Sequence, residues 1–212
     1  MKGLLLKDWF VLWKQCKWML FLVILYTLLP LVSDGAGTFL ACFSVLFMAI
    51  LPITVLGFDE RSKWERYAAA LPVSRDDLVL SKYLLALLGM IGAALLYLLS
   101  SLVLSAVRPG SVSPQETVSF LCLLFAGALA FDAVNFPIIF RLGVEKGRLW
   151  FFLIAALFGG AIGAASAVAG DAAVSLGQAL LGVPVWAFPL AALAVFGLSA
   201  WLSCRLYARR DL

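Results

Sequence analysis

The residues that could do chemistry in this chain are few, and most reactive types are missing. The sequence has no histidine, which removes imidazole bases, zinc motifs built on histidine and haem ligation by imidazole. The four cysteines have no Cys-x-x-Cys spacing, and all but Cys16 lie in apolar runs, as packing residues do. The P-loop pattern GxxxxGK[ST] is also absent. We therefore expect no catalytic residue, metal ligand or cofactor on this chain.

Two polar side chains inside an apolar run are the exception to this pattern. Asp132 lies about nine residues before Arg141, roughly 13 Å along a helix, and Asn135 follows one turn later. A carboxylate within a membrane span is costly and is a candidate functional group. Pro137 allows a second interpretation, because a proline frees backbone groups that nearby polar side chains can satisfy. Both interpretations stay open: Asp132 and Asn135 support a kinked helix, or they line a substrate path.

The longest charged segment of the chain, residues 59–83, predicts a helix, a corner and a second helix. Trp64, Tyr67 and Leu71 recur at helical spacing with charged residues on the other side, so this part is predicted as a short amphipathic helix. Pro72 ends that helix, because proline has no amide hydrogen and restricts the residue before it.

A long helix is predicted to begin directly after this corner. Ser74 is a typical N-cap residue, and Asp77 follows at the spacing of a capping box. No stop signal occurs before Val107. A helix over 75–107 would be about 50 Å long, whereas the hydrocarbon core of a bilayer is roughly 30 Å thick. Its first turns are therefore expected to project into water.

Composition places the chain among integral membrane proteins. Hydrophobic residues make up 64% and charged residues 13% of the 212 residues, with a mean hydropathy of +1.06. We expect an all-α fold with one polytopic membrane domain, six transmembrane helices and an N-terminal interfacial helix. The predicted ranges are 1–17 for the interfacial helix, 18–32, 38–58, 83–107, 117–140, 149–169 and 185–207 for the transmembrane helices, and 59–82 for the charged loop.

The basic residues predict the orientation of the chain. All 16 Lys and Arg residues except Arg108 fall in 1–17, 59–82, 141–148 or the C-terminal segment, so both termini and the charged loop are expected in the cytoplasm. No further basic face is visible that would suit nucleic acid. Segment 1–17 is long and rich in tryptophan, and no small-x-small cleavage site closes the apolar run that follows it, which favours an interfacial helix over a signal peptide. The stretch 172–181 is predicted to lie on the outer surface or to dip back into the membrane.

A stripe of small residues marks the fifth predicted span. Ala155, Gly159, Gly163 and Ala167 recur every four positions, which lets another helix approach closely. This stripe suits packing within the subunit and packing across a dimer equally well.

The chain resembles the small bacterial permease subunits of type-2 ABC exporters in the segments FDERSKWERY, LPVSR and SKYL, in its opening MKGLLLKD and in its six-span layout. It is especially similar to the branch that contains the phenol-soluble-modulin exporter permeases. In that family the loop between the second and third spans carries a coupling helix, which docks on a separate cytoplasmic ABC ATPase. The resemblance implies that ATP and Mg bind to that ATPase and that the coupling contacts here come from Asp59, Glu60, Lys63, Trp64, Glu65, Arg66, Tyr67, Leu71 and Pro72.

The resemblance also implies the assembly and the activity. Family permeases work as two membrane subunits with two ATPases, and the first and fifth spans commonly line the interface between the membrane subunits. The expected function is the permease of an ATP-driven exporter in the bacterial cytoplasmic membrane, which moves an amphipathic peptide or another hydrophobic substrate. The chain itself would be no enzyme. A secondary transporter that uses Asp132 to couple to ions or protons, a small membrane enzyme and a heterodimer with a related permease remain alternatives.

Overall fold

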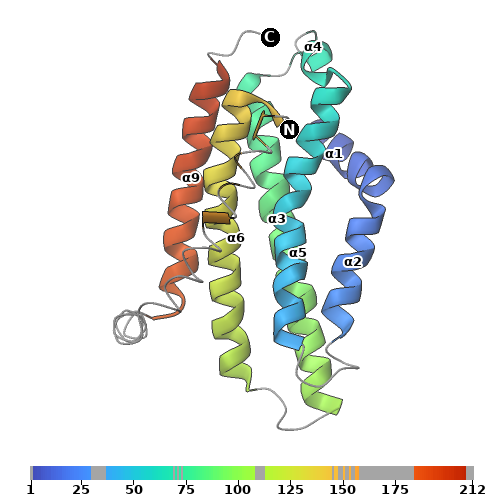
Figure 1. Ribbon diagram of the computed structural model, residues 1–212, viewed down its shortest axis with the longest axis vertical. Coiled ribbons are helices and arrows are strands. Elements are labelled where there is room, and N and C mark those ends of the chain that lie inside the picture. The colour runs from blue at the N-terminus through green and yellow to red at the C-terminus, as the bar shows by residue number, and fades with distance from the viewer. Residues whose placement is uncertain are drawn as a thin grey trace.

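The computed structural model describes residues 2–29, 37–68, 70, 72, 74–107, 113–144, 146–147, 150, 153, 156–157 and 184–208. Within these ranges the ordered elements are all α helices, and the long ones stand side by side in an elongated bundle (Figure 1). The prediction of an all-α chain is therefore confirmed.

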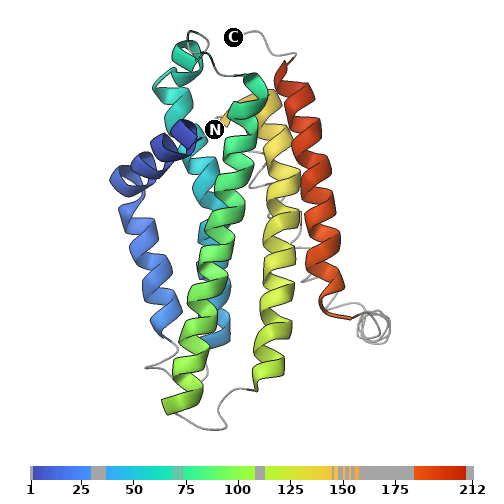
Figure 2. The same ribbon diagram turned by 180° about the vertical axis from the view of Figure 1, so that it is seen from behind.

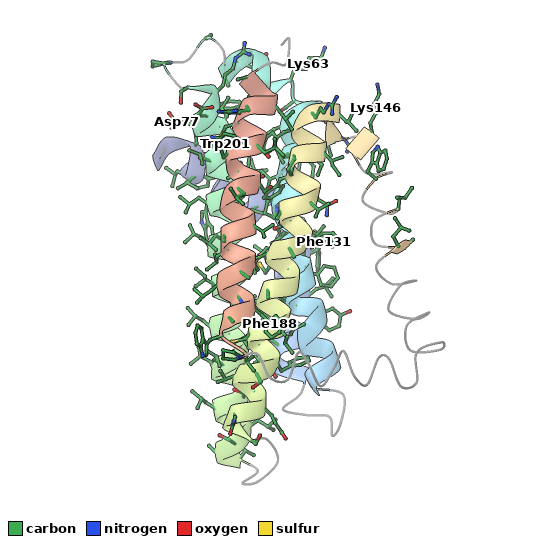
Figure 3. All side chains as sticks on the ribbon, turned by 90° about the vertical axis from the view of Figure 1, so that its left-hand side faces the viewer. Lys63, Asp77, Phe131, Lys146, Phe188 and Trp201 are labelled. Carbon is green, nitrogen blue, oxygen red and sulfur yellow. The ribbon has the colours of Figure 1, made fainter. Side chains whose placement is uncertain are left out.

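The helices α2, α3, α5 and α6 run along the bundle in alternating directions, and α9 runs in the same direction as α6 (Figure 1). The short helix α4 lies at one end, and the C-terminal end of α9 lies at that same end (Figure 1). We call it the charged end, since Lys63, Asp77 and Lys146 gather there, as Figure 3 shows. The bounds are α1 Lys2–Gln15, α2 Lys17–Leu28, α3 Gly37–Arg61, α4 Trp64–Ala68, α5 Arg75–Val107, α6 Pro114–Leu142 and α9 Ala187–Ala208.

Three of the described helices are long and apolar enough to cross a membrane, namely α5, α6 from Gln115 onward, and α9. The helices α1 and α2 meet at 79° and would add a fourth span if counted as one. Large apolar side chains such as Leu102 and Leu198 are 64% and 68% exposed, which suits helices surrounded by lipid. The six-span layout stays a prediction, because 149–169 is described only at isolated positions and 172–181 lies outside the described residues.

Local signals explain where α5 begins. The Ser74 Oγ atom accepts a hydrogen bond from the Asp77 backbone N–H at 3.1 Å, so the N-cap forms as its residue type predicts. The helix then continues to Val107 over 33 residues, about 50 Å at 1.5 Å per residue. One stiff element thus joins the charged end to the opposite end of the bundle.

Aromatic side chains hold the core of the bundle together between α5, α6 and α9. The Tyr83 ring of α5 meets the Phe136 ring of α6 edge to face, with centroids 4.6 Å apart, and lies 4.9 Å from the Phe196 ring of α9. Small residues such as Ala86 and Ala133 are buried beside them and let the helices approach closely. Because lipid is as apolar as these side chains, close packing and hydrogen bonds hold the helices together more than the hydrophobic effect does.

Helix α1 is inclined to the long helices and runs outward from them, near the charged end, before the chain turns into α2 (Figure 2). Its buried residues Leu4, Asp8 and Leu12 recur every fourth position and face the protein. Cys16, which follows the helix, is buried as well. Trp13, on the other side, is 64% exposed. The helix thus has one side that binds the bundle and one aromatic side that suits a membrane interface.

Candidate functional site

Four charged side chains from three helices meet at the charged end of the bundle. Lys7 and Asp8 come from α1, Asp59 from α3 and Lys82 from α5; we call this group the charged junction. The Lys7 Nζ atom lies 2.7 Å from Asp59 Oδ1 and 3.0 Å from Asp8 Oδ1. The Lys82 Nζ atom lies 2.6 Å from Asp8 Oδ1 and 2.7 Å from Asp59 Oδ2. Each of the three helices is therefore joined to the other two by at least one ion pair.

The charged junction is buried, which makes its pairing obligatory. Asp8 is 0%, Lys82 4% and Asp59 7% exposed. Removing a charge from water costs several kcal/mol, and a close partner of opposite sign must offset that cost. The two lysines and two aspartates balance each other, whereas Asp8, Asp59 or Lys82 left alone would be a buried unpaired charge. Lys7 lies at the edge of the group, with 22% of its side chain exposed.

Two further contacts tie neighbouring segments to the charged junction. The Lys7 Nζ atom lies 4.5 Å from the centre of the Trp64 ring, a cation–π contact that brings α4 against α1. The Glu60 Oε2 atom accepts a hydrogen bond from the backbone N–H of Val144, which follows the end of α6. Through Glu60, the end of α3 also holds the segment after α6.

The residues predicted as coupling contacts belong to different structural elements. Asp59 and Glu60 belong to the last turn of α3, and α4 begins only at Trp64. Lys63 lies between the two helices with a φ of 54°, a left-handed conformation that ends α3. The contacts themselves stay a prediction, with Leu71 and the side chains of Glu65 and Arg66 outside the described residues.

The coupling candidates that the structure describes fall into an exposed group and a more buried group. Lys63 and Pro72 are exposed, and Tyr67 is 67% exposed. Trp64 is half-buried over Lys7, and Asp59 is enclosed in the charged junction. A partner at this end would therefore meet Lys63, Tyr67 and Pro72 directly, whereas Asp59 would act from beneath the surface.

A second polar site lies on α6, inside the bundle. Asp132 is 0% exposed, and neither of its carboxylate oxygens has a hydrogen-bond partner within the described part of the chain. The Asn135 Nδ2 atom donates to the Phe131 carbonyl at 2.8 Å, on its own helix. The two predicted polar residues are therefore not brought together by a hydrogen bond that the structure describes.

The backbone group freed by Pro137 finds its partner on another helix. Pro137 has no N–H for the carbonyl of Ala133, and the Ser199 Oγ atom of α9 donates to that carbonyl at 2.6 Å. The Tyr83 hydroxyl lies 2.8 Å from Ser199 Oγ and 2.7 Å from Ser203 Oγ. This bridge joins α5, α6 and α9. The sequence feature that could have indicated this bridge is the pair Ser199 and Ser203, four positions apart in an apolar span.

An apolar groove lies between the bent pair α1–α2 and the helices α3 and α5. Its volume is about 520 Å³. The walls include Trp9 and Leu12 of α1, Leu20 of α2, and Gly89 and Gly92 of α5. A Cβ atom at Gly92 would meet nothing within 4 Å, so the groove is open there. Such a volume is in the range of sites for small hydrophobic ligands.

The remaining candidate features add no further residues to these sites. The stripe residues Ala155, Gly159, Gly163 and Ala167 lie outside the described residues. Among the residues that are described, no group of three His, Cys, Asp or Glu side chains is placed to hold a metal ion.

Comparison with known proteins gives one match that spans nearly the whole chain. The family model described as "ABC-2 family transporter protein" matches residues 3–208. No curated protein and no solved structure matches the chain.

Proposed function

The chain belongs to the ABC-2 family of transporter proteins, and from this premise we propose that it is the permease of an ATP-driven exporter for amphipathic peptides or other hydrophobic substrates. Its family and its apolar helices make it a multi-pass membrane permease of an ABC transporter, a transport component and not itself an enzyme. Permeases of this family typically work with an ATPase partner. ATP and Mg bind to that partner, because this sequence has no P-loop.

The observation that carries the coupling proposal is the construction of the charged end. Lys63 and Tyr67 are exposed there, and Trp64 between them lies against Lys7 of the charged junction, which belongs to three helices. A cytoplasmic ATPase docks on the segment 59–72 and displaces it when ATP closes the ATPase subunits. The stiff helix α5 carries this displacement towards the other end of the bundle. Two permease copies, identical or related, open a pathway between them.

The apolar groove supports the proposed class of cargo. Its walls are apolar and include α1, whose exposed aromatic side suits the membrane interface. A hydrophobic or amphipathic molecule that leaves the inner leaflet meets this groove before the interior of the bundle. A peptide of the phenol-soluble-modulin type fits this chemistry, and it is the cargo that the sequence resemblance favours. The chain then works in a bacterial cytoplasmic membrane with both termini inside.

Affinity purification in a mild detergent tests the proposal. We expect an ATP-binding protein to purify with the chain and to lose its attachment in Lys63→Glu/Tyr67→Ala. Charge reversal at Glu65 or Arg66 tests the same surface. The matched control is Glu116→Gln, an exposed position at the opposite end of α6. If no ATP-binding protein accompanies the wild-type chain, or if the purified chain alone moves cargo in vesicles, the proposal is wrong.

A further inference from the structure

The ion pairs of the charged junction join three helices that are far apart in the sequence. Lys7 pairs with Asp59 between α1 and α3, Asp8 with Lys82 between α1 and α5, and Asp59 with Lys82 between α3 and α5. These links form a closed triangle. A movement of any one helix relative to the other two must break at least one pair.

Burial makes such a break unfavourable. Asp8, Asp59 and Lys82 are each less than a tenth exposed, so water cannot readily replace a lost partner. Coulomb attraction is also stronger in this environment than at an exposed surface. A movement of the three helices as one body therefore costs less free energy than a movement of one helix past the other two.

Apolar packing continues the same connection along α1. Leu12 of α1 and Cys16, which follows α1, are buried together with Leu51 and Val55 of α3 and Leu85 of α5. The same three helices thus meet twice, once through charges and once through close-packed side chains. Directly after Cys16 the chain turns by 79° into α2.

We infer that α1 is a force-transmitting element: the charged junction holds α1, the end of α3 and the start of α5 as one rigid unit, so that a push on α4 also moves α2. Trp64 of α4 lies over Lys7 and gives the push a direct route to α1. The inference rests on the proposed function for the source of the push. It assigns Lys7 and Asp8 as positioning residues that act through Asp59 and Lys82.

Distance measurements between spin labels test the rigid unit without any knowledge of the cargo. The labels replace Phe10 on α1 and Arg61 at the end of α3, which are both exposed, in a chain whose native cysteines are changed to alanine. We expect one narrow distance distribution that keeps its mean when ATP and vanadate trap the purified permease–ATPase complex. A shift of that mean on trapping would show that α1 does not move with α3, and it would overturn the inference.

A double variant that neutralises both α1 charges provides a second test, which we call the variant arm. Lys7→Met/Asp8→Asn removes both α1 charges, leaves the Asp59–Lys82 pair intact and keeps the junction free of net charge. We expect its distance distribution to broaden at least twofold, whereas Lys7→Arg/Asp8→Glu keeps the narrow distribution. The control Lys14→Met/Glu116→Gln removes the same two charge types from exposed positions and should resemble the wild type.

The two arms separate this inference from the proposed function. The variant arm is measured first on the permease alone in nanodiscs, so it gives a result even if no ATPase purifies with the chain. An unchanged distribution in Lys7→Met/Asp8→Asn contradicts the rigid unit and leaves the transporter assignment untouched. If this variant does not fold, as judged by its helical circular dichroism, the wild-type trapping measurement decides the question.

Discussion

Removal of Lys82 is the most direct test of the energetics of the charged junction. The Lys82 ammonium is 4% exposed and lies 2.6 Å from Asp8 and 2.7 Å from Asp59. Lys82→Met preserves the length and the apolar stem of the side chain but leaves two buried carboxylates with Lys7 as their shared partner. Breaking a buried pair in this way costs about 3–5 kcal/mol. We expect a loss of stability in that range.

A double variant shows whether the loss comes from charge or from packing. Lys82→Met/Asp59→Asn removes one charge of each sign and leaves Lys7 and Asp8, whose charged atoms lie 3.0 Å apart. Replacement of a buried pair by neutral groups of similar volume is often close to neutral. We therefore expect the double variant to be more stable than Lys82→Met by about 2 kcal/mol or more, because it leaves no uncompensated buried carboxylate.

The assay is reversible unfolding in mixed micelles of SDS and a mild detergent, followed by circular dichroism. Lys14→Met removes an exposed lysine from α1 and is the control, with little change expected. Equal destabilisation in the single and double variants would refute the electrostatic reasoning. That result would mean that the unpaired buried carboxylate is not the source of the lost stability.

Three other predictions concern single positions. Ser199→Ala leaves the Ala133 carbonyl without its donor, and we expect a loss of about 1–3 kcal/mol in the same unfolding assay; a neutral result would mean that water or another group replaces the hydroxyl. Lys63→Gly relieves a left-handed φ of 54° and should raise stability by up to about 1 kcal/mol, whereas Lys63→Val should lower it; the opposite order would contradict the assigned helix end. Asp132→Asn retains the shape of a side chain that is 0% exposed and should leave ATP-dependent transport in proteoliposomes unchanged; a loss of transport would support a substrate path or ion coupling through Asp132.

The elements set by local signals could be predicted from the sequence. Ser74 caps α5 through a neighbour only three positions away, and the apolar run that follows needs no distant partner to be helical. The all-α class followed in the same way from composition. Such features depend on short stretches of chain, which a single sequence displays in full.

The charged junction could not be predicted, because its partners are distant in the sequence. Lys82 lies 74 positions from Asp8 and 23 from Asp59, and nothing in the charged loop distinguishes Asp59 from its exposed neighbours. Its burial depends on α1 folding back against α3. Ser199 was missed for a similar reason, since its role depends on a proline that lies on a different helix.

The separation of these residues also dictates an order of events during synthesis. Lys7 and Asp8 leave the ribosome long before Asp59 and Lys82 have been added to the chain. Until then the N-terminal helix has charges without their final partners, so it must wait in water or among lipid headgroups. It can settle against the bundle only after α3 and the beginning of α5 have emerged. The first helix to be made therefore reaches its final place only after parts of two later helices have been added to the chain.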